Sequence, residues 1–126
     1  MRVRAPGIQG SFEVLHNHAP MIAAIEIGPL YITNTENQKI AFATSGGFVE
    51  VLNNTVTILA ETAEPASDID IERAKAAEEK ALALLESDDA DQRERARRKL
   101  ERARLRMSMG KVGTASQKSR TARPLD

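Results

Sequence analysis

The hydrophobic pattern of the chain changes period near Pro65, and this change restricts the fold more than any other feature. Up to residue 63, short runs rich in β-branched and aromatic residues are separated by Gly, Pro and Asn, which is typical of strands and turns. From residue 70 onward, apolar residues recur at steps of three and four, which is typical of amphipathic helices. The sequence therefore predicts two small domains of different secondary structure.

The charged residues are divided at the same place. The 18 Lys and Arg residues balance 18 Asp and Glu residues, but residues 1–63 carry only three basic and five acidic side chains, whereas 70–106 carry eleven and ten. A net charge of zero argues against a dedicated nucleic-acid-binding protein, which needs excess positive charge to displace counterions from phosphates.

The absence of cysteine excludes disulfides, thiolate zinc sites and cysteine nucleophiles. With no long apolar run or signal-peptide pattern, we expect a soluble intracellular protein or a soluble part of an assembly.

Residues 1–63 are predicted to form an antiparallel β-sandwich or barrel. The predicted strands are 2–5, 11–15, 21–27, 30–33, 39–44, 48–52 and 55–60. We interpret Gly28-Pro29 and Ser45-Gly46-Gly47 as turns between them. Because the connections are too short for crossover helices, neighbouring strands must pair antiparallel.

Residues 64–109 are predicted to form an antiparallel two-helix hairpin, and 110–126, which lack periodicity, a disordered tail. A stripe of mostly small apolar residues follows each helix: Ile71, Ala74, Ala77, Ala81 and Leu84 on the first, and Ala96, Leu100, Ala103 and Met107 on the second. Each buried methyl is worth only about 0.8 kcal/mol, so the hairpin is modestly stabilised. Close helix packing is the favoured interpretation of the small residues, and a hairpin that opens is the alternative.

No catalytic signature is found in the sequence. It contains no Gly-rich phosphate loop ending in Lys-Ser/Thr, no G-x-S-x-G and no H-E-x-x-H. His16 and His18 lie two residues apart, but two nitrogens alone make a weak metal site, so we interpret them as structural or contact residues.

Charged groups are expected to converge at the base of the hairpin, where the end of the second helix returns beside the start of the first. These groups are Glu64, Asp70, Arg73, Arg102 and Arg106. Arginine offers planar donors that suit phosphate. The alternative, which these residues alone favour, is a set of surface salt bridges worth about 0 to 1 kcal/mol each.

Three segments in order resemble the epsilon subunit of F-type ATP synthases. Residues 10–20, G-S-F-E-V-L-H-N-H-A-P, are similar to the family's G-E-x-G-I-L-P-G-H-A-P loop. Residues 45–51 match its S-G-G-F-x-E-V hairpin, and 69–74, I-D-I-E-R-A, match the I/L-D-x-x-R-A motif that opens its helical hairpin. The order of these segments, on a strand domain followed by a hairpin, makes the resemblance specific.

The resemblance implies a noncatalytic subunit of the central stalk, with no required cofactor and no nucleic-acid partner. In that family the sandwich binds the gamma subunit and the c-ring and helps couple proton flow to ATP synthesis, at the cytoplasmic side of the bacterial inner membrane. Ser11 falls where the family often has a glutamate that contacts the c-ring, and His18 falls on the histidine that faces gamma. Glu13, two residues beyond Ser11, is a candidate for the missing carboxylate.

The resemblance also implies regulation by the hairpin, which in this family folds on the sandwich or extends into the alpha/beta catalytic head and blocks ATP hydrolysis. Some bacterial members bind ATP in the folded form. The corresponding residues here are Glu64, Ile69, Asp70, Arg73, Ala74, Arg102 and Arg106. At the position of another arginine of the family this chain has Lys80, which keeps the positive charge but lacks the planar guanidinium group.

Family members usually have about two further strands before the stretch that matches 1–5, so we expect additional sequence ahead of Met1. The alternative function is a free-standing protein-interaction module unrelated to ATP synthase, which would not bind gamma.

Overall fold

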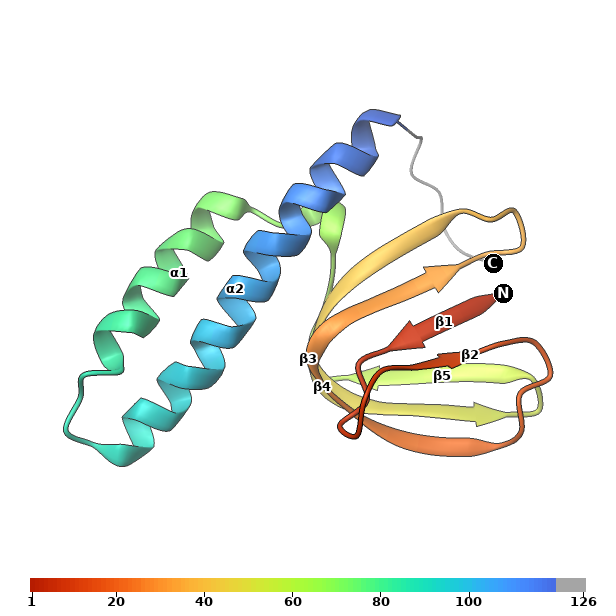
Figure 1. Ribbon diagram of the computed structural model, residues 1–126, viewed down its shortest axis with the longest axis horizontal. Coiled ribbons are helices and arrows are strands. Elements are labelled where there is room, and N and C mark those ends of the chain that lie inside the picture. Colours follow the sequence, from red (N-terminus) through yellow and green to blue (C-terminus); the bar gives the residue numbers. More distant parts are fainter. Residues whose placement is uncertain (120–126) are drawn as a thin grey trace.

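The computed structural model describes the backbone of residues 1–119 and the side chains of residues 1–110. The elements of the described chain are β1 (Arg2–Ala5), β2 (Phe12–Val14), β3 (Met21–Thr33), β4 (Lys39–Leu52), β5 (Thr55–Ala60), β6 (Ala63–Pro65), the 3-10 turn η1 (Ala66–Asp68), α1 (Ile71–Leu84) and α2 (Ala90–Ser119). Strands precede helices, as the change of period predicts (Figure 1). The predicted fold class, an antiparallel β-domain followed by a helical hairpin, is confirmed.

All strand pairs are antiparallel, in the order β2-β1-β3-β4-β5, with β6 also paired to β4. The long β3–β4 hairpin curves, so the sheet folds back as two layers that are joined at the bend (Figure 1). Its two halves have different neighbours: β6 pairs with the first half of β4, and β5 with the second. Buried aliphatic side chains fill the space between the layers: Val3, Ala5, Val14, Ile25, Leu30, Val49 and Val51.

The turns predicted at Gly28-Pro29 and Ser45-Gly46-Gly47 are wrong, because both segments lie inside long strands. Pro29 is opposite Ala43, and Gly47 is paired with Ile25 on one side and Ala60 on the other. Glycine inside a strand often marks a bend or a close approach of backbones rather than a turn. The predicted domain boundary at residue 63 also falls inside a strand, β6, which joins the sandwich to the hairpin.

Alanines form the contact between the two helices. Four of them, which we call the helix seam, are at most 2% exposed: Ala74, Ala81, Ala96 and Ala103. Asp70 caps the N-terminus of α1 by accepting a hydrogen bond from the Arg73 backbone N–H. Leu84, predicted in the same stripe, is 39% exposed. No helix in the described part of the chain is long and apolar enough to cross a membrane.

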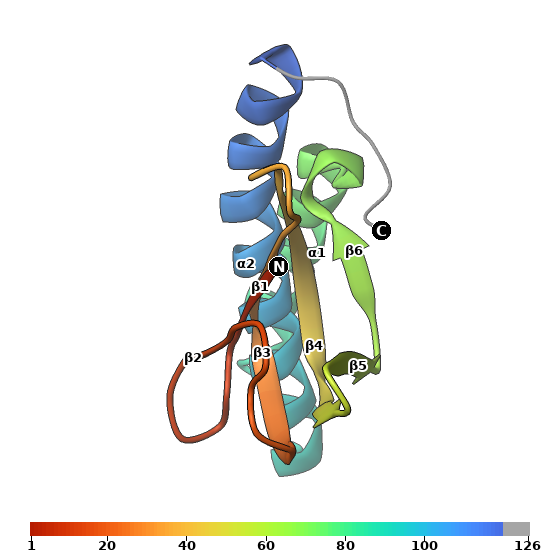
Figure 2. The same cartoon turned by 90° about the vertical axis from the view of Figure 1, so that its right-hand side faces the viewer.

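The hairpin packs on the sandwich through α2, and α1 lies on the far side of α2 (Figures 1 and 2). Met109 of α2 is buried against Ala43, Ala66 and Ile69. The second helix was predicted to end at residue 109, but α2 continues to Ser119, so the predicted tail begins within a helix. The remainder of that predicted tail, 120–126, lies outside the described residues.

Candidate functional site

A pocket of about 710 Å³ lies between the hairpin and the side of the sandwich that faces it. Its walls come from residues 43–45 of β4, from β6, and from the facing sides of α1 and α2. The charged side chains along it are Glu64, Asp68, Lys80, Lys99, Arg102 and Arg106. We call this space the hairpin pocket; it exists only while the two helices lie against the sandwich.

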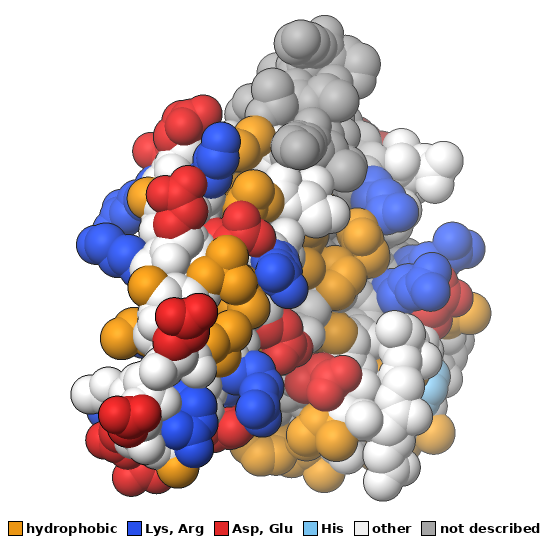
Figure 3. Space-filling model, turned by 60° about the vertical axis from the view of Figure 1, so that its left-hand side comes forward, with side chains coloured by type: hydrophobic (Ala, Val, Ile, Leu, Met, Phe, Trp, Pro, Cys, Tyr) orange, Lys and Arg blue, Asp and Glu red, His pale blue; other side chains and the backbone are white. Residues whose placement is uncertain are grey.

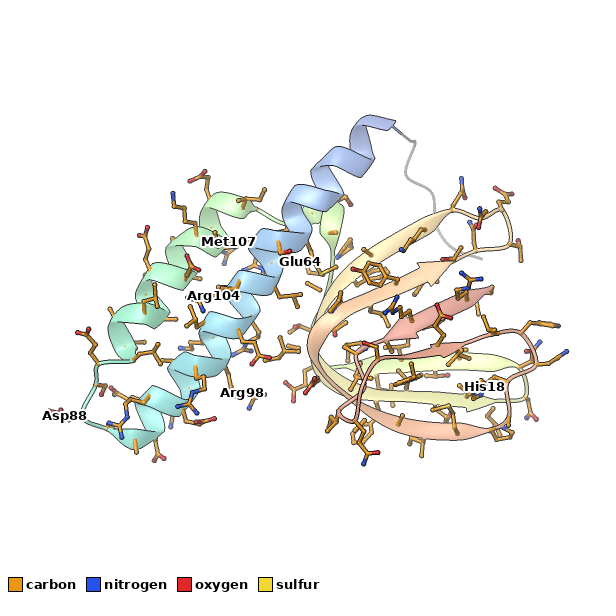
Figure 4. The ribbon with its side chains drawn as sticks, in the orientation of Figure 1. His18, Glu64, Asp88, Arg98, Arg104 and Met107 are labelled. Carbon is orange, nitrogen blue, oxygen red and sulfur yellow. The ribbon has the colours of Figure 1, made fainter. Side chains whose placement is uncertain are left out.

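An ion pair between Glu64 and Arg106 crosses the hairpin pocket. The Arg106 Nε donates to Glu64 Oε1 at 2.8 Å, and its second terminal nitrogen lies 3.4 Å from Oε2. The Glu64 side chain is 34% exposed and the Arg106 side chain 25%, so water screens this pair only partly. Because Glu64 belongs to β6 and Arg106 to α2, the pair ties the sandwich directly to the second helix. Figure 4 shows Glu64 where the sandwich meets α2.

The other cations of the hairpin pocket are not neutralised. Lys80, Lys99 and Arg102 make no salt bridge with a carboxylate of the described chain. Among the described residues of the lining, Asp68 is the one carboxylate besides Glu64. The pocket therefore has an excess of positive charge, which suits an anionic ligand such as a phosphate chain.

The structure brings together three of the seven residues predicted to bind a nucleotide. Glu64, Arg102 and Arg106 line the hairpin pocket, together with Lys80. The remaining four do not line it: Ile69 is packed beneath Met109, Asp70 caps α1, Arg73 is exposed, and Ala74 is in the helix seam. These four are adjacent in the I-D-I-E-R-A motif, and here they begin the helix and anchor it.

The three residues predicted to contact gamma or the c-ring lie around β2. Ser11 precedes the strand, Glu13 is exposed within it, and His18 follows it. His18 lies at the end of the sandwich remote from the hairpin (Figure 4), and its Nδ1 is 2.8 Å from the Ala19 carbonyl oxygen. The His16 ring lies 3.3 Å from the Asn54 side-chain amide, so the two histidines make separate local contacts.

An apolar patch on the outer face of the sandwich was not predicted from the sequence. Ile22, Phe48 and Leu59 are 67%, 52% and 64% exposed. Phe48 is paired directly with Leu59, and Ile22 lies in the neighbouring strand β3. The signal was present, because residues 21–27 and 48–52 carry apolar residues in both alternating positions. By contrast, Figure 3 shows charges of both signs mixed over the hairpin, with apolar side chains between them.

The chain is similar to known ATP synthase chains. Residues 1–66 match the beta-sandwich domain of the ATP synthase Delta/Epsilon chain family. The ATP synthase epsilon chain of Salinibacter ruber is 54% identical over 123 residues, which covers 89% of this chain and 83% of the relative. The epsilon chain of Desulfitobacterium hafniense is 56% identical over 77 residues, which covers 60% of this chain and 57% of the relative.

The fold is similar to that of a chain in a solved structure of the Euglena gracilis mitochondrial ATP synthase, which comprises OSCP, F1 and the c-ring. The TM-score is 0.75 at 27% identity, and the match covers 82% of this chain and 66% of that chain. A chain in the central stalk and c-ring structure of the Tetrahymena thermophila mitochondrial ATP synthase has the same fold, with a TM-score of 0.58 at 19% identity, covering 86% and 81% of the two chains.

Proposed function

This chain belongs to the ATP synthase Delta/Epsilon chain family, and on that premise we propose that it is the epsilon subunit of an ATP synthase central stalk. The observation that carries the proposal is the 54% identity to the Salinibacter ruber epsilon chain, which extends through both the sandwich and the hairpin. The fold likeness to a chain of the Euglena F1/c-ring assembly supports the same place in the complex. The complex is membrane-associated, and we place this subunit at the cytoplasmic side of a bacterial inner membrane.

The proposed role is mechanical and noncatalytic. The sandwich would contact the gamma subunit and the c-ring, and so transmit rotation between proton flow and ATP synthesis. The apolar patch of Ile22, Phe48 and Leu59 supports a protein partner, because exposed apolar surface of this kind is usually covered in an assembly. Ser11, Glu13 and His18 remain proposed contacts to these partners.

The hairpin is proposed to regulate ATP hydrolysis. In the folded form, α2 is held by Met109 and by the Glu64–Arg106 pair, and the helix seam that joins α1 to α2 is made of small side chains. Extension of the helices would carry the cations of α2 toward the alpha/beta catalytic head. ATP that binds only the folded form would oppose this change, and a shift from 1:99 to 99:1 requires about 5.5 kcal/mol of differential affinity.

A reconstitution experiment tests the subunit assignment. The chain is added to an ATP synthase depleted of its epsilon subunit, and assembly with gamma and ATP-driven proton pumping are measured. We expect stoichiometric binding and restored coupling, and a chain ending at residue 69 should restore coupling but inhibit hydrolysis less. If the chain does not bind gamma, the assignment is wrong and the free-standing interaction module is favoured.

Titration of the isolated chain with MgATP, followed by calorimetry, tests the regulatory ligand separately. We expect ATP to bind in the hairpin pocket, and Arg102→Gln to weaken binding about tenfold, since a charge-assisted hydrogen bond is lost. Arg98→Gln is the matched control, because Arg98 is exposed on the same helix and does not line the pocket. Absence of binding, or equal loss in both variants, would reject ATP as the ligand and leave the stalk role intact.

A further inference from the structure

The basic residues of the sandwich gather at one place. Residues 1–63 contain three Lys or Arg residues, Arg2, Arg4 and Lys39, which are separated by as many as 37 positions in the sequence. All three line one surface hollow of about 360 Å³, together with Glu13, Tyr31, Thr33 and Asn37. We call this the basic hollow. The five acidic side chains of the same segment are not gathered in this way, because only Glu13 lines it.

The pairing of β1, β3 and β4 produces this arrangement. Arg2 is opposite Thr33, which is opposite Lys39, so these three residues form one row across the strands. Arg4 is opposite Tyr31 in the next row on the same face, with Glu13 beside Arg4 on β2. Strands lie about 4.8 Å apart and alternate residues about 7 Å apart, so the Cα atoms of the three basic residues span a triangle about 10 Å wide.

The cations in the basic hollow are available to a ligand. Arg2, Arg4 and Lys39 are exposed, and none of them makes a salt bridge within the part of the chain that the structure describes. The Lys39 Nζ lies 4.4 Å from the centre of the Tyr31 ring, a cation–π contact that positions the ammonium without neutralising it. Thr33, Asn37 and Tyr31 add hydroxyl and amide donors to the same walls.

We propose that the basic hollow binds a carboxylate-rich segment of a protein partner. Three cations spread over about 10 Å match two or more carboxylates along an extended peptide better than one compact phosphate. A flat anionic lipid surface fits poorly, because the site is concave. This inference concerns a different site from the hairpin pocket and does not rest on the proposed function, although the hollow shares Glu13 with the proposed gamma and c-ring contacts.

Tyr31 supplies a direct test, because it is the only tyrosine in a chain without tryptophan. The full chain is titrated with a hexaglutamate peptide, and binding is followed by tyrosine fluorescence and by backbone amide NMR shifts. We expect saturable changes in the fluorescence of Tyr31 and in the backbone amide shifts of residues 2–4. These changes should be lost at high salt, because about 1 M salt reduces the Debye length to about 3 Å.

Three variants make the test specific. Arg2→Gln with Arg4→Gln should weaken the peptide-induced change at Tyr31 about tenfold, since each exposed pair is worth up to about fivefold in affinity. Glu13→Gln should raise the affinity for the peptide, because the repelling carboxylate is removed. Arg95→Gln with Arg98→Gln, two exposed cations of α2, is the matched control and should leave it unchanged.

The remaining outcomes overturn the proposal. A lack of peptide-induced change at Tyr31 would show that hexaglutamate does not occupy the basic hollow, and equal loss in the control variant would show that it binds the arginines of α2 instead. A change produced equally by inorganic phosphate would indicate a simple anion site, and one produced only by phosphatidylglycerol vesicles would indicate a lipid site. Circular dichroism of each variant establishes that it is folded before titration.

Discussion

At the scale of single residues, Gly47 shows how closely the strands approach. Its φ is +137°, and a Cβ placed there would lie 2.0 Å from the Leu59 carbonyl oxygen. No rotation of a side chain relieves that contact, because both groups belong to the backbone of paired strands. Gly47 is therefore required by the structure of the sheet rather than by a turn.

Gly47→Ala is expected to destabilise the protein by about 3 kcal/mol or more, since the β4–β5 pairing must open to admit the methyl group. Urea unfolding followed by circular dichroism measures this loss. Gly10→Ala is the control, because Gly10 also has a positive φ, +124°, but has no atom within 4 Å of the added Cβ. It should cost only about 1 to 2 kcal/mol of strain, and similar losses in the two variants would contradict the steric explanation.

The Glu64–Arg106 pair is expected to have measurable coupling. In a double-mutant cycle with Glu64→Gln and Arg106→Gln, we expect a coupling free energy of about 1 kcal/mol, because the pair is bidentate and partly buried. The Arg104–Glu78 pair is the comparison, with a single 3.2 Å contact and an arginine side chain 59% exposed. Its coupling should not exceed about 0.5 kcal/mol. Equal coupling in the two cycles would contradict a special role for Glu64.

At the scale of elements, the helix seam limits the distance between α1 and α2. Ala74→Leu is expected to destabilise the hairpin by about 1 to 3 kcal/mol, because Ala74 is 0% exposed and extra methyl groups force the helices apart. Ala76→Leu, two positions along the same helix and exposed, is the matched control and should be nearly neutral. Helix content followed during thermal unfolding measures the stability of both variants. Equal losses would show that helix propensity, not packing, is responsible.

The hairpin as an element was predictable, but its length was not. The stripe of apolar residues ends at Met107 and the helix was predicted to end at residue 109; beyond it no periodicity marks a helix, yet α2 continues to Ser119. Ser67, Asp68 and Asp70 were all available to cap the start of α1, and the carboxylate of Asp70 does so. A capping residue is a local signal in the sequence. A helix that has already formed can be extended one residue at a time without any such signal.

At the scale of the whole molecule, the hairpin and the sandwich share a small apolar contact centred on Met109. Met109→Ala is expected to cost about 2 kcal/mol or more, since a thioether buried against Ala43, Ala66 and Ile69 is removed. The hairpin should then undock before the sandwich unfolds. The chain lacks cysteine, so Asp88→Cys and Thr57→Cys can carry a fluorescent pair that reports the distance between the two domains. An unchanged distance on mild heating would contradict a docking role for Met109.

The hairpin pocket was only partly predictable from the sequence. The convergence of Glu64, Arg102 and Arg106 follows from an antiparallel hairpin, because its ends must meet. The exclusion of Arg73 does not follow, since it depends on how α1 is rotated about its axis by the helix seam. Lys80 and Lys99 line the pocket for the same reason, although nothing in their local sequence distinguishes them from other surface lysines.

The sequence by itself determined the division into strands and helices, the antiparallel pairing, the hairpin and, through three short motifs, the family. These features depend on side-chain periodicity and connection length, which are properties of neighbouring residues. Only the tertiary structure decided that Gly28-Pro29 and Gly46-Gly47 lie within strands, because glycine and proline have the same local chemistry in a turn and in a strand that bends. It alone also brought Arg2, Arg4 and Lys39 into one hollow, since the register between strands is set by burial of the whole sheet.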